Sequence, residues 1–395
     1  MKRVKMIDTI ALLIPEKDFI ILKHENFTPN SIGLFAKPYF PLSQKKYIRV
    51  VNNPTKKEKE IYGYLPRISL TKSLRPGGFS ILMKIEFSIP KLLYGNNFEE
   101  VQNKDFINIV RKLKEQLSIM GVAISTDVLT NAKVTNLHYS KNFILKEGEH
   151  CKQYITEIMK SDINKWNDTN QTDFRNEGHS FKFHSNNVEV IFYDKLKDLE
   201  QAKKSDKRSI ENDNSGQLDL LKSLPHKNEI FRMETRMNQA RSIKTKFKQN
   251  NIEIENTFIK CFNSEYSMKI LSLEVNKIIS KTPKTFQNQT SSLEDLFFEI
   301  NSSNPSIKFQ KIIEIIGAIL LQKEIGTKGF RNLAENKRID WHKYKSRTLN
   351  IELNDKPTSL LKKILCELGS YNAIKLDNNK EYKELVAKDD KENIQ

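Results

Sequence analysis

Residues 79–88 read FSILMKIEFS, a stretch in which apolar and polar side chains alternate. Alternation with a period of two is typical of a β-strand with one buried and one solvated face. Residues 104–120 instead repeat apolar side chains at helical spacing, and Gly121 suits the C-terminal cap of such a helix. A strand followed closely by an amphipathic helix predicts a sheet with helices packed on it.

Other short runs extend this pattern over the first 245 residues. Turn signals such as Asn52-Asn53-Pro54 separate them. A second helix is predicted over residues 154–166. Further strands are predicted at 9–14, 47–51, 133–142, 188–195 and 229–237. The pattern therefore predicts an α+β fold with a mainly antiparallel sheet.

Composition and periodicity divide the chain into four parts. They are an α+β catalytic domain (1–250), a helical connector (251–289), a smaller all-α domain (290–377) and a flexible tail (378–395). Within the first part, residues 200–228 form a polar insertion that we expect to be a mobile helix and loop. No internal repeat is visible in the sequence.

The 395 residues carry a formal net charge of +17. Residues 1–75 contribute 15 Lys/Arg against 6 Asp/Glu, and residues 221–250 contribute 8 against 2. This positive charge predicts a polyanionic partner.

The 3 cysteines form no Cys-x-x-Cys zinc motif and favour a reducing, cytoplasmic location. No apolar run approaches the roughly 20 residues of a membrane span, so we expect no membrane partner.

The run 188–195 contains a candidate nucleophile, Tyr193, with Lys195 two positions further on. Because strand side chains alternate, both are expected on one side of the strand. A neighbouring lysine stabilises a phenolate, which attacks a phosphodiester more readily than a phenol does. The alternative is a half-buried tyrosine beside a lysine that reaches solvent.

Residues 231–237 place a polar face, Arg232-x-Glu234-x-Arg236, opposite an apolar one. A carboxylate between two guanidinium groups can bind Mg²⁺ or Mn²⁺ while the arginines hold phosphate oxygens. The same pattern also suits a solvated ladder of ion pairs.

Three histidines of the sequence bear on a possible metal site. His138 lies in a strand-like run and is a candidate ligand, with a hydrogen-bonded core histidine as the alternative. His179 and His184 are five residues apart, which places them on opposite faces of a strand. This spacing excludes them as a paired ligand set.

The stretch 329–347 is typical of two short helices around a tight turn. The second helix is basic and aromatic and suits a DNA groove, with Lys343, Lys345 and Arg347 as contacts. A helical bundle with a basic face is the alternative.

Five segments together resemble the phage and plasmid replication initiators of the gene II/gene X class, which are rolling-circle nickases. In chain order they are MIDTI (6–10), IEFSIPKLLYGNNF (85–98), HYSKN (138–142), FYDK (192–195) and FRMETR (231–236). The resemblance spans about residues 6–245.

This resemblance implies that Tyr193 cleaves one DNA strand at an origin, becomes linked to the 5′ phosphate and frees a 3′ hydroxyl primer. It points to Glu234 as a ligand of Mg²⁺ or Mn²⁺. His138 stands near the place where relatives have an aspartate, so the second ligand is His138 or absent.

A host helicase and polymerase are implied partners. The predicted DNA contacts in the matching segments are Arg232, Arg236 and Lys141. The alternative function is a non-catalytic origin- or operator-binding protein.

Overall fold

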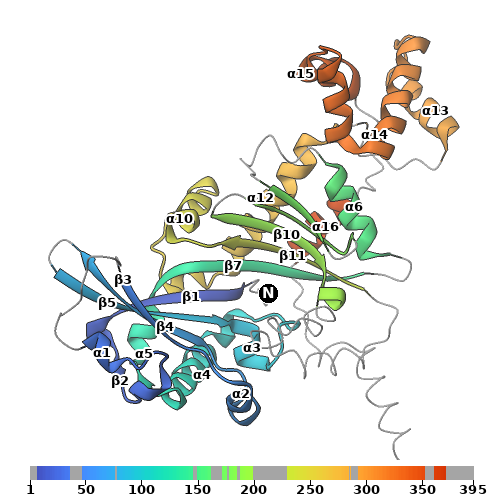
Figure 1. Cartoon of the computed structure of the whole chain (residues 1–395). Coiled ribbons are helices and arrows are strands. Elements are labelled where there is room, and N and C mark those ends of the chain that lie inside the picture. Colours follow the sequence, from blue (N-terminus) through green and yellow to red (C-terminus); the bar gives the residue numbers. More distant parts are fainter. Residues whose placement is uncertain are drawn as a thin grey trace, which may run out of the picture.

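An antiparallel sheet of nine strands forms the centre of the molecule (Figure 1). The computed structural model describes residues 7–35, 47–75, 78–145, 149–161, 171–175, 178–184, 187–198, 229–283, 285, 292–351 and 360–370. The strands are β1 (Ile7–Pro15), β3 (Tyr47–Asn52), β4 (Arg67–Arg75), β5 (Gly78–Ser88), β7 (Lys133–Ile144), β8 (Gln171–Arg175), β9 (Ser180–His184), β10 (Val188–Asp194) and β11 (Ile230–Met237). Two short strands, β2 (Ile20–Ile21) and β6 (Val122–Ala123), pair separately.

The strand predicted over residues 79–88 is confirmed as part of β5. Its alternate side chains Ile81, Met83, Ile85 and Phe87 are buried, and it pairs with β1 on one side and β4 on the other. The predicted α+β class with a mainly antiparallel sheet is also confirmed, because every strand pair in the large sheet is antiparallel.

The two halves of the sheet share one topology, although the sequence shows no repeat. The strand order is β3-β4-β5-β1-β7-β11-β10-β9-β8. In the first half, the chain leaves β1 and returns through the meander β3-β4-β5 to pair with it. In the second half, it leaves β7 and returns through β8-β9-β10-β11. The first strands of the two halves, β1 and β7, pair at the seam.

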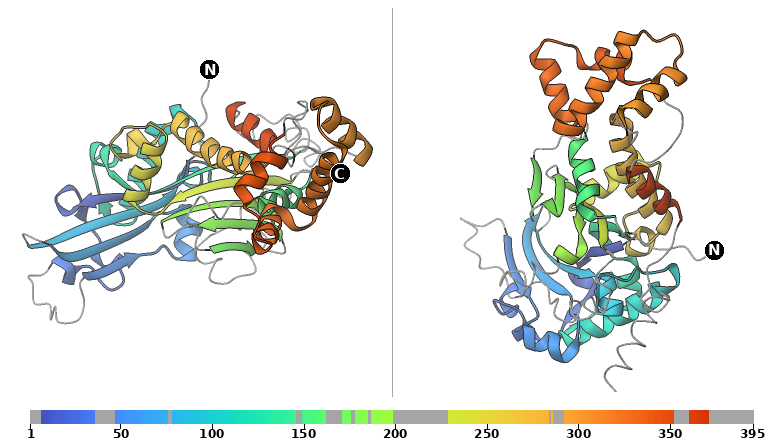
Figure 2. Two further views of the ribbon diagram at one scale, coloured as in Figure 1. Left: turned by 90° about the horizontal axis from the view of Figure 1, so that it is seen from above. Right: turned by 90° about the vertical axis from the view of Figure 1, so that its right-hand side faces the viewer.

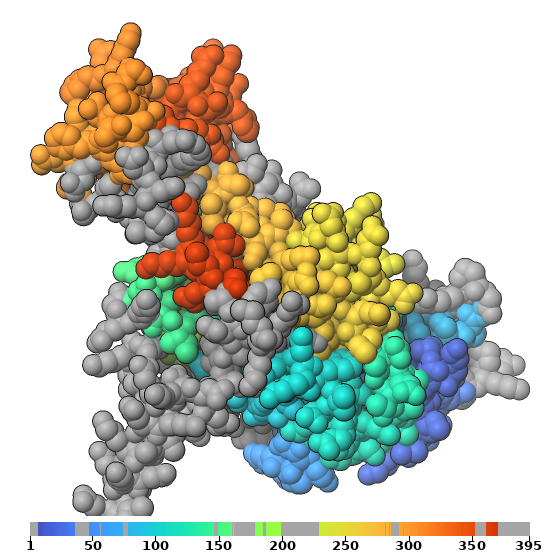
Figure 3. All heavy atoms as spheres, turned by 180° about the vertical axis from the view of Figure 1, so that it is seen from behind, coloured from blue at the N-terminus to red at the C-terminus, as the bar shows by residue number. Residues whose placement is uncertain are grey.

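Most helices pack against one face of this sheet, which we call the helix face. Seen from above and from behind, α10 (Ala240–Gln249), α12 (Ser264–Lys281) and α16 (Leu360–Ser370) cover it (Figures 2 and 3). One continuous core joins the sheet to these helices. The remaining helices around the sheet are α1 (Ile32–Phe35), α2 (Lys56–Tyr62), α3 (Ile89–Tyr94), α4 (Phe106–Ile119), α5 (Thr126–Asn131), α6 (Cys151–Lys160) and α11 (Phe258–Cys261).

A small helical module stands away from the sheet at one end of the molecule (Figure 1). It consists of α13 (Leu293–Ser303), α14 (Phe309–Asn336), α15 (Trp341–Tyr344) and a wide helical turn (Lys345–Leu349). α14 bends at Gly326, whose φ of 76° suits glycine. Two small apolar clusters of its own hold this module together.

The structure differs from the predicted domain boundaries in two places. α12 lies in the predicted connector, yet it packs on β7 and β11. α16 lies in the predicted C-terminal domain, yet Leu361, Ile364 and Leu368 are buried in the core of the sheet. Both helices belong to the sheet unit because their apolar stripes complete its core.

Several predicted segments extend beyond the described residues. The helix predicted at 154–166 is described as α6, which ends at Lys160. The insertion at 200–228 and the tail at 378–395 lie outside the described residues. Among the helices that the structure describes, none has the length and apolar content to cross a bilayer.

Replacing Lys246 tests how strongly α10 is held to α12. Its Nζ lies 2.7 Å from Glu274 Oε1, and both side chains are buried. Lys246→Met leaves Glu274 with the partly exposed Lys277 alone, so we expect the free energy of unfolding to fall by about 3 kcal/mol in urea titrations. In the control Lys269→Met, an exposed pair with Glu265 is lost, at a cost of about 0.5 kcal/mol or less. Equal losses in the two variants would contradict this role of the buried pair.

Candidate active site

The polar side chains of β11 share one face of the sheet with those of its two neighbours. Glu234 pairs with Ser140 of β7 and with Ile191 of β10. Arg236 pairs with His138 in the same way. Directly paired residues of antiparallel strands point to the same side, so the predicted Arg-Glu-Arg face is found as expected. We call this side, which carries His138, Glu234 and Tyr193, the site face.

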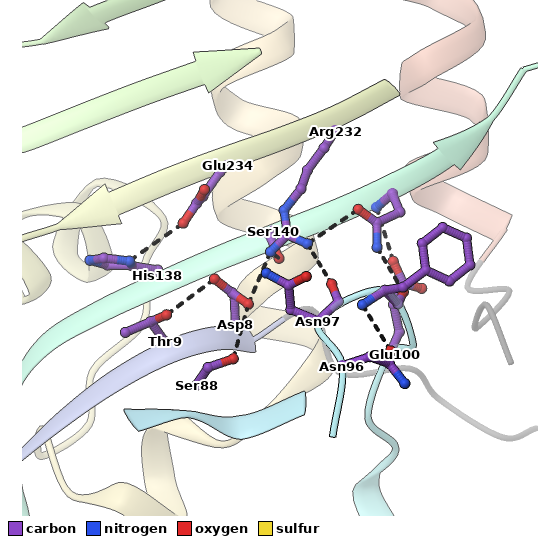
Figure 4. Close-up of polar contacts among 12 residues, drawn as sticks. Asp8, Thr9, Ser88, Asn96, Asn97, Glu100, His138, Ser140, Arg232 and Glu234 are labelled. Carbon is purple, nitrogen blue, oxygen red and sulfur yellow. Dashed lines mark hydrogen bonds and ion pairs between the residues drawn. The ribbon is translucent and has the colours of Figure 1, made fainter. Parts of the chain in front are cut away.

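Glu234 and His138 point toward one another across adjacent strands (Figure 4). His138 Nδ1 lies 3.4 Å from Glu234 Oε1. Two ligands at about 2.1 Å from a metal ion, at right angles, are about 3 Å apart, so this separation suits a shared ion. Glu234 Oε1, the oxygen that faces His138 Nδ1, is buried without an aligned hydrogen-bond partner. The donor pair therefore fits a divalent cation, and the role of both residues as metal ligands stays a prediction.

Glu234 is ionised in this setting. Burial by itself would raise the pKa of its carboxyl group, but Arg236, His138 and Arg232 outweigh burial and hold that pKa well below the ordinary value. Arg236 Nη2 lies 3.0 Å from Glu234 Oε2. The carboxylate is thus a ready oxygen donor rather than a proton acceptor.

Tyr193 lies next to this pair. Its hydroxyl donates to Glu234 Oε2 at 3.4 Å, and 7% of the residue is exposed. Burial raises the pKa of Tyr193 well above the ordinary value of 10, with Arg232 opposing and Glu234 adding to the rise. The phenol is therefore protonated at neutral pH and needs help from its neighbours to become a nucleophile.

Lys195 is close to Tyr193, although not for the predicted reason. The strand ends at Asp194 and a short helical turn begins at Lys195, so strand alternation does not place this side chain. Its Nζ nevertheless lies 5.8 Å from the centre of the Tyr193 ring. Burial, together with the charge of Arg232, lowers the pKa of Lys195 to about 8. The lysine still carries its proton through most of the neutral range.

Arg232 does not suit its predicted DNA contact. The residue is 1% exposed, and its Nη2 lies 3.0 Å from Asp8 Oδ1 and 2.9 Å from Ser140 Oγ. Its Nη1 donates to the Asn97 carbonyl at 2.8 Å (Figure 4). With these partners, the Arg232 guanidinium holds neighbouring side chains of the site in place and is not available to DNA.

Asp8 is the site residue that the sequence pattern did not indicate. It is the second residue of β1 and accepts from Arg232, Thr9 Oγ1 and, at 3.5 Å, Ser88 Oγ. The available signal was a single acidic residue in the MIDTI segment, just before an apolar run. Only the pairing of β1 with β7 brings this carboxylate to the site face.

The two other predicted contacts in the sheet behave differently from each other. Arg236 has 34% of its side chain exposed and lies 3.6 Å from Glu189 and 3.0 Å from Glu234. It remains available at the edge of the site. Lys141 is instead buried and paired with Glu100 at 2.6 Å, so its prediction as a DNA contact is not supported. It alternates with the site-face residues of β7, which explains its burial.

The structure also places a second tyrosine and the two histidines that their spacing excluded as a paired ligand set. Tyr139 of β7 is buried in the core and donates to the Cys261 carbonyl at 3.0 Å. It does not face the site. His184 pairs across from Glu189, whereas His179 lies 3.4 Å from Asp194. The two histidines are therefore in different surroundings.

The predicted helix pair of the C-terminal module is present in outline. The end of α14 and the start of α15 are joined by residues 337–340. Trp341 packs edge-on against Phe330 at 5.8 Å, which fixes the pair. Lys343 and Arg347 are exposed and Lys345 is half-buried. Their DNA contacts stay predictions.

The chain was compared with family models, with curated proteins and with solved structures, and none of these comparisons found a match.

Proposed function

We propose that the protein is a replication initiator that nicks one DNA strand by tyrosine transesterification. The observation that carries this proposal is the convergence of the Tyr193 hydroxyl, the Glu234 carboxylate and the His138 imidazole beside the seam of the sheet. A nucleophile, an oxygen donor and a nitrogen donor on one face are the parts that metal-assisted phosphoryl transfer needs. The basic charge of the chain supports the choice of DNA as substrate.

In the proposed reaction, the Tyr193 oxygen forms a bond to phosphorus and the bond from phosphorus to the 3′ oxygen breaks. The phenol loses its proton, and the leaving 3′ oxygen gains one. Lys195, as a cation, stabilises the phenolate. Glu234 and His138 would hold Mg²⁺ or Mn²⁺, which supplies Lewis-acid stabilisation of the phosphate charge. The products are a 5′-phosphotyrosyl link and a free 3′ hydroxyl.

The site face continues over the N-terminal half of the sheet and suggests where the DNA lies. Through β1, the register places Arg67 and Glu86 on the same side as His138. Arg49 of β3 also lies on this side and donates to Ser69 Oγ at 3.2 Å. Arg49 and Arg67 are exposed. With about 4.8 Å between strands, Arg67 is roughly 20 Å from Glu234, a distance that a few nucleotides bridge.

Neutralising these two arginines should weaken DNA binding through lost phosphate contacts. For the double variant Arg49→Gln/Arg67→Gln, we expect the slope of log affinity against log salt to become shallower by about 1.4 on single-stranded DNA. The control Arg241→Gln/Lys248→Gln removes two exposed charges from α10, on the helix face, and should leave the slope unchanged. Fluorescence anisotropy over a salt series measures both. Equal changes in the two variants would argue against a DNA path on the site face.

The proposed function is tested by a search for the covalent intermediate. The full chain is incubated with Mn²⁺ and random single-stranded oligonucleotides that carry either a 3′ or a 5′ label. We expect a denaturing gel to show the 3′ label on the protein and the 5′ label on a released fragment. Binding without any adduct would instead support the second candidate, a non-catalytic DNA-binding protein. The burial of Tyr193 is the observation that favours that candidate.

A further inference from the structure

A second group of metal-binding side chains lies apart from Glu234 and His138. It consists of Cys151 at the start of α6, Asp194 at the end of β10 and Glu229 just before β11. The thiol sulfur and one oxygen of each carboxylate lie within 4.8 Å of one another. Asp194 alternates with Tyr193 along β10, so this group is on the other side of the sheet from the candidate active site. We call it the Cys151 cluster.

The hydrogen bonds of the Asp194 and Glu229 carboxylates use only part of the accepting capacity of their oxygen atoms. Asp194 Oδ1 accepts from the backbone N–H groups of Leu196 and Lys197, at 2.9 and 3.2 Å, and its Oδ2 lies 3.4 Å from His179 Nδ1. Glu229 Oε2 accepts from the Cys151 N–H at 2.6 Å, and its Oε1 lies 2.8 Å from His150 Nδ1. Each carboxylate can still use a second lone pair of an oxygen for a cation.

His179 lies next to the cluster and contacts one of its carboxylates. His179 Nδ1 lies 3.4 Å from Asp194 Oδ2. This nitrogen is buried and has no aligned hydrogen-bond partner. A buried ring nitrogen without an aligned hydrogen bond is uncommon, because its desolvation costs free energy that a hydrogen bond would compensate. His179 faces Asp194 but is not among the residues whose ligand atoms lie within 4.8 Å of one another, so it orients the Asp194 carboxylate from beside the cluster.

The charge of the cluster also favours a cation. Cys151 is fully buried and Asp194 is 2% exposed. Burial and the nearby Glu229 carboxylate raise the pKa of Asp194 above its ordinary value, while backbone hydrogen bonds and His179 oppose that rise. Burial, Asp194 and Glu229 likewise raise the pKa of the Cys151 thiol. A divalent ion bound among these groups would offset the repulsion between their negative charges.

We propose that the Cys151 cluster binds one Zn²⁺ ion in a site that links α6 to β10 and β11, with His179 holding the Asp194 carboxylate in place. Thiolate and carboxylate are ligands that zinc takes, at about 2.0 to 2.3 Å, and a water molecule would complete a four-coordinate arrangement. On binding, the Cys151 thiol releases its proton and a zinc–sulfur bond forms. The ligand atoms must move together by a fraction of an ångström or more. This proposal does not depend on the proposed function.

Metal content provides the first test. The full chain, purified without chelator and then dialysed, should contain about one zinc per molecule by mass spectrometry of the metal. Cys151→Ala should lose the zinc. The matched control Cys261→Ala removes an equally buried thiol, at the end of α11, and should keep it. Retention in His138→Gln would show that the zinc is not at the candidate active site.

Cobalt and thermal unfolding provide readouts that do not depend on nicking. Replacement of zinc by Co²⁺ should give a thiolate-to-cobalt absorption band in the full chain and in Cys261→Ala, and no band in Cys151→Ala. His179→Gln keeps the thiol and should weaken zinc binding at least about tenfold, because even residues that only orient a ligand are worth about 10–100-fold. Added zinc should raise the unfolding temperature only where the site is intact.

Three outcomes would overturn the proposal. One is a folded full chain that neither contains zinc nor takes it up from buffered zinc solution. Another is the same zinc affinity in Cys151→Ala and Cys261→Ala. The third is a cobalt spectrum without a thiolate band. None of these outcomes bears on the covalent adduct at Tyr193, so the two proposals fail separately.

Discussion

Tyr193→Phe should abolish the covalent DNA adduct, with a loss of about 10⁴-fold or more in nicking, and leave DNA affinity unchanged. The substitution removes only the hydroxyl, which donates one long hydrogen bond of 3.4 Å to Glu234. The ring keeps its packing, so the variant should fold as the original chain does. Catalytic residues act as a group, so removing the nucleophile alone typically lowers the rate about as much as removing the whole group. A denaturing gel with 3′-labelled oligonucleotide measures the adduct.

Tyr47→Phe is the matched control for this experiment. Tyr47 lies on the site face of β3 and is 58% exposed, and it is far from Glu234 in the strand order. Its variant should form the adduct as the original chain does. An adduct of normal yield in Tyr193→Phe would remove Tyr193 as nucleophile. Tyr139 would not replace it, because that side chain is in the core.

Glu234→Gln should lower nicking by about 10³-fold and raise the Mn²⁺ concentration needed for half of the remaining activity. The amide keeps the shape of the side chain but removes the charge that faces His138 and the predicted ion. Lewis-acid stabilisation by a bound cation is worth several kcal/mol, and about 4 kcal/mol corresponds to this factor. Single-turnover nicking over a series of Mn²⁺ concentrations measures both quantities.

Glu189→Gln is the control that tests whether Glu234→Gln acts only by removing a carboxylate that contacts Arg236. Glu189 and Glu234 both contact Arg236, at 3.6 and 3.0 Å, but only Glu234 lies beside His138 and Tyr193. Glu189→Gln should therefore change the rate little and leave the Mn²⁺ dependence as it is. If the two variants behave alike, Glu234 acts through the arginine and not through a metal.

Local patterns along the chain were sufficient for several elements that have one solvated face. The alternation in residues 79–88 predicted β5, and the helical stripe in 104–120 predicted α4, because burial on one side leaves a period in the sequence. Three strands of the large sheet, β4, β8 and β9, were not predicted. β8 and β9 are five residues long, too short for a period to stand out.

The long-range arrangement of the fold was not visible in the sequence. The similar strand order of the two halves has no matching sequence repeat. The order in which strands pair does not require particular residues, because many different apolar side chains can fill the buried positions of a strand. The boundary predicted after residue 250 was misplaced for a related reason. The stripes of α12 and α16 show that each helix buries a face, but they do not show against which partner.

For the candidate site, the sequence alone determined which side chains of one strand point the same way, as with Arg232, Glu234 and Arg236. That property is local, since it follows from the geometry of an extended backbone. The tertiary structure decided what stands opposite. It set Asp8 against Arg232, buried Lys141, and brought Cys151, Asp194 and Glu229 together from distant parts of the chain. Strand register and helix packing make these contacts, and both are settled by the burial of the whole core.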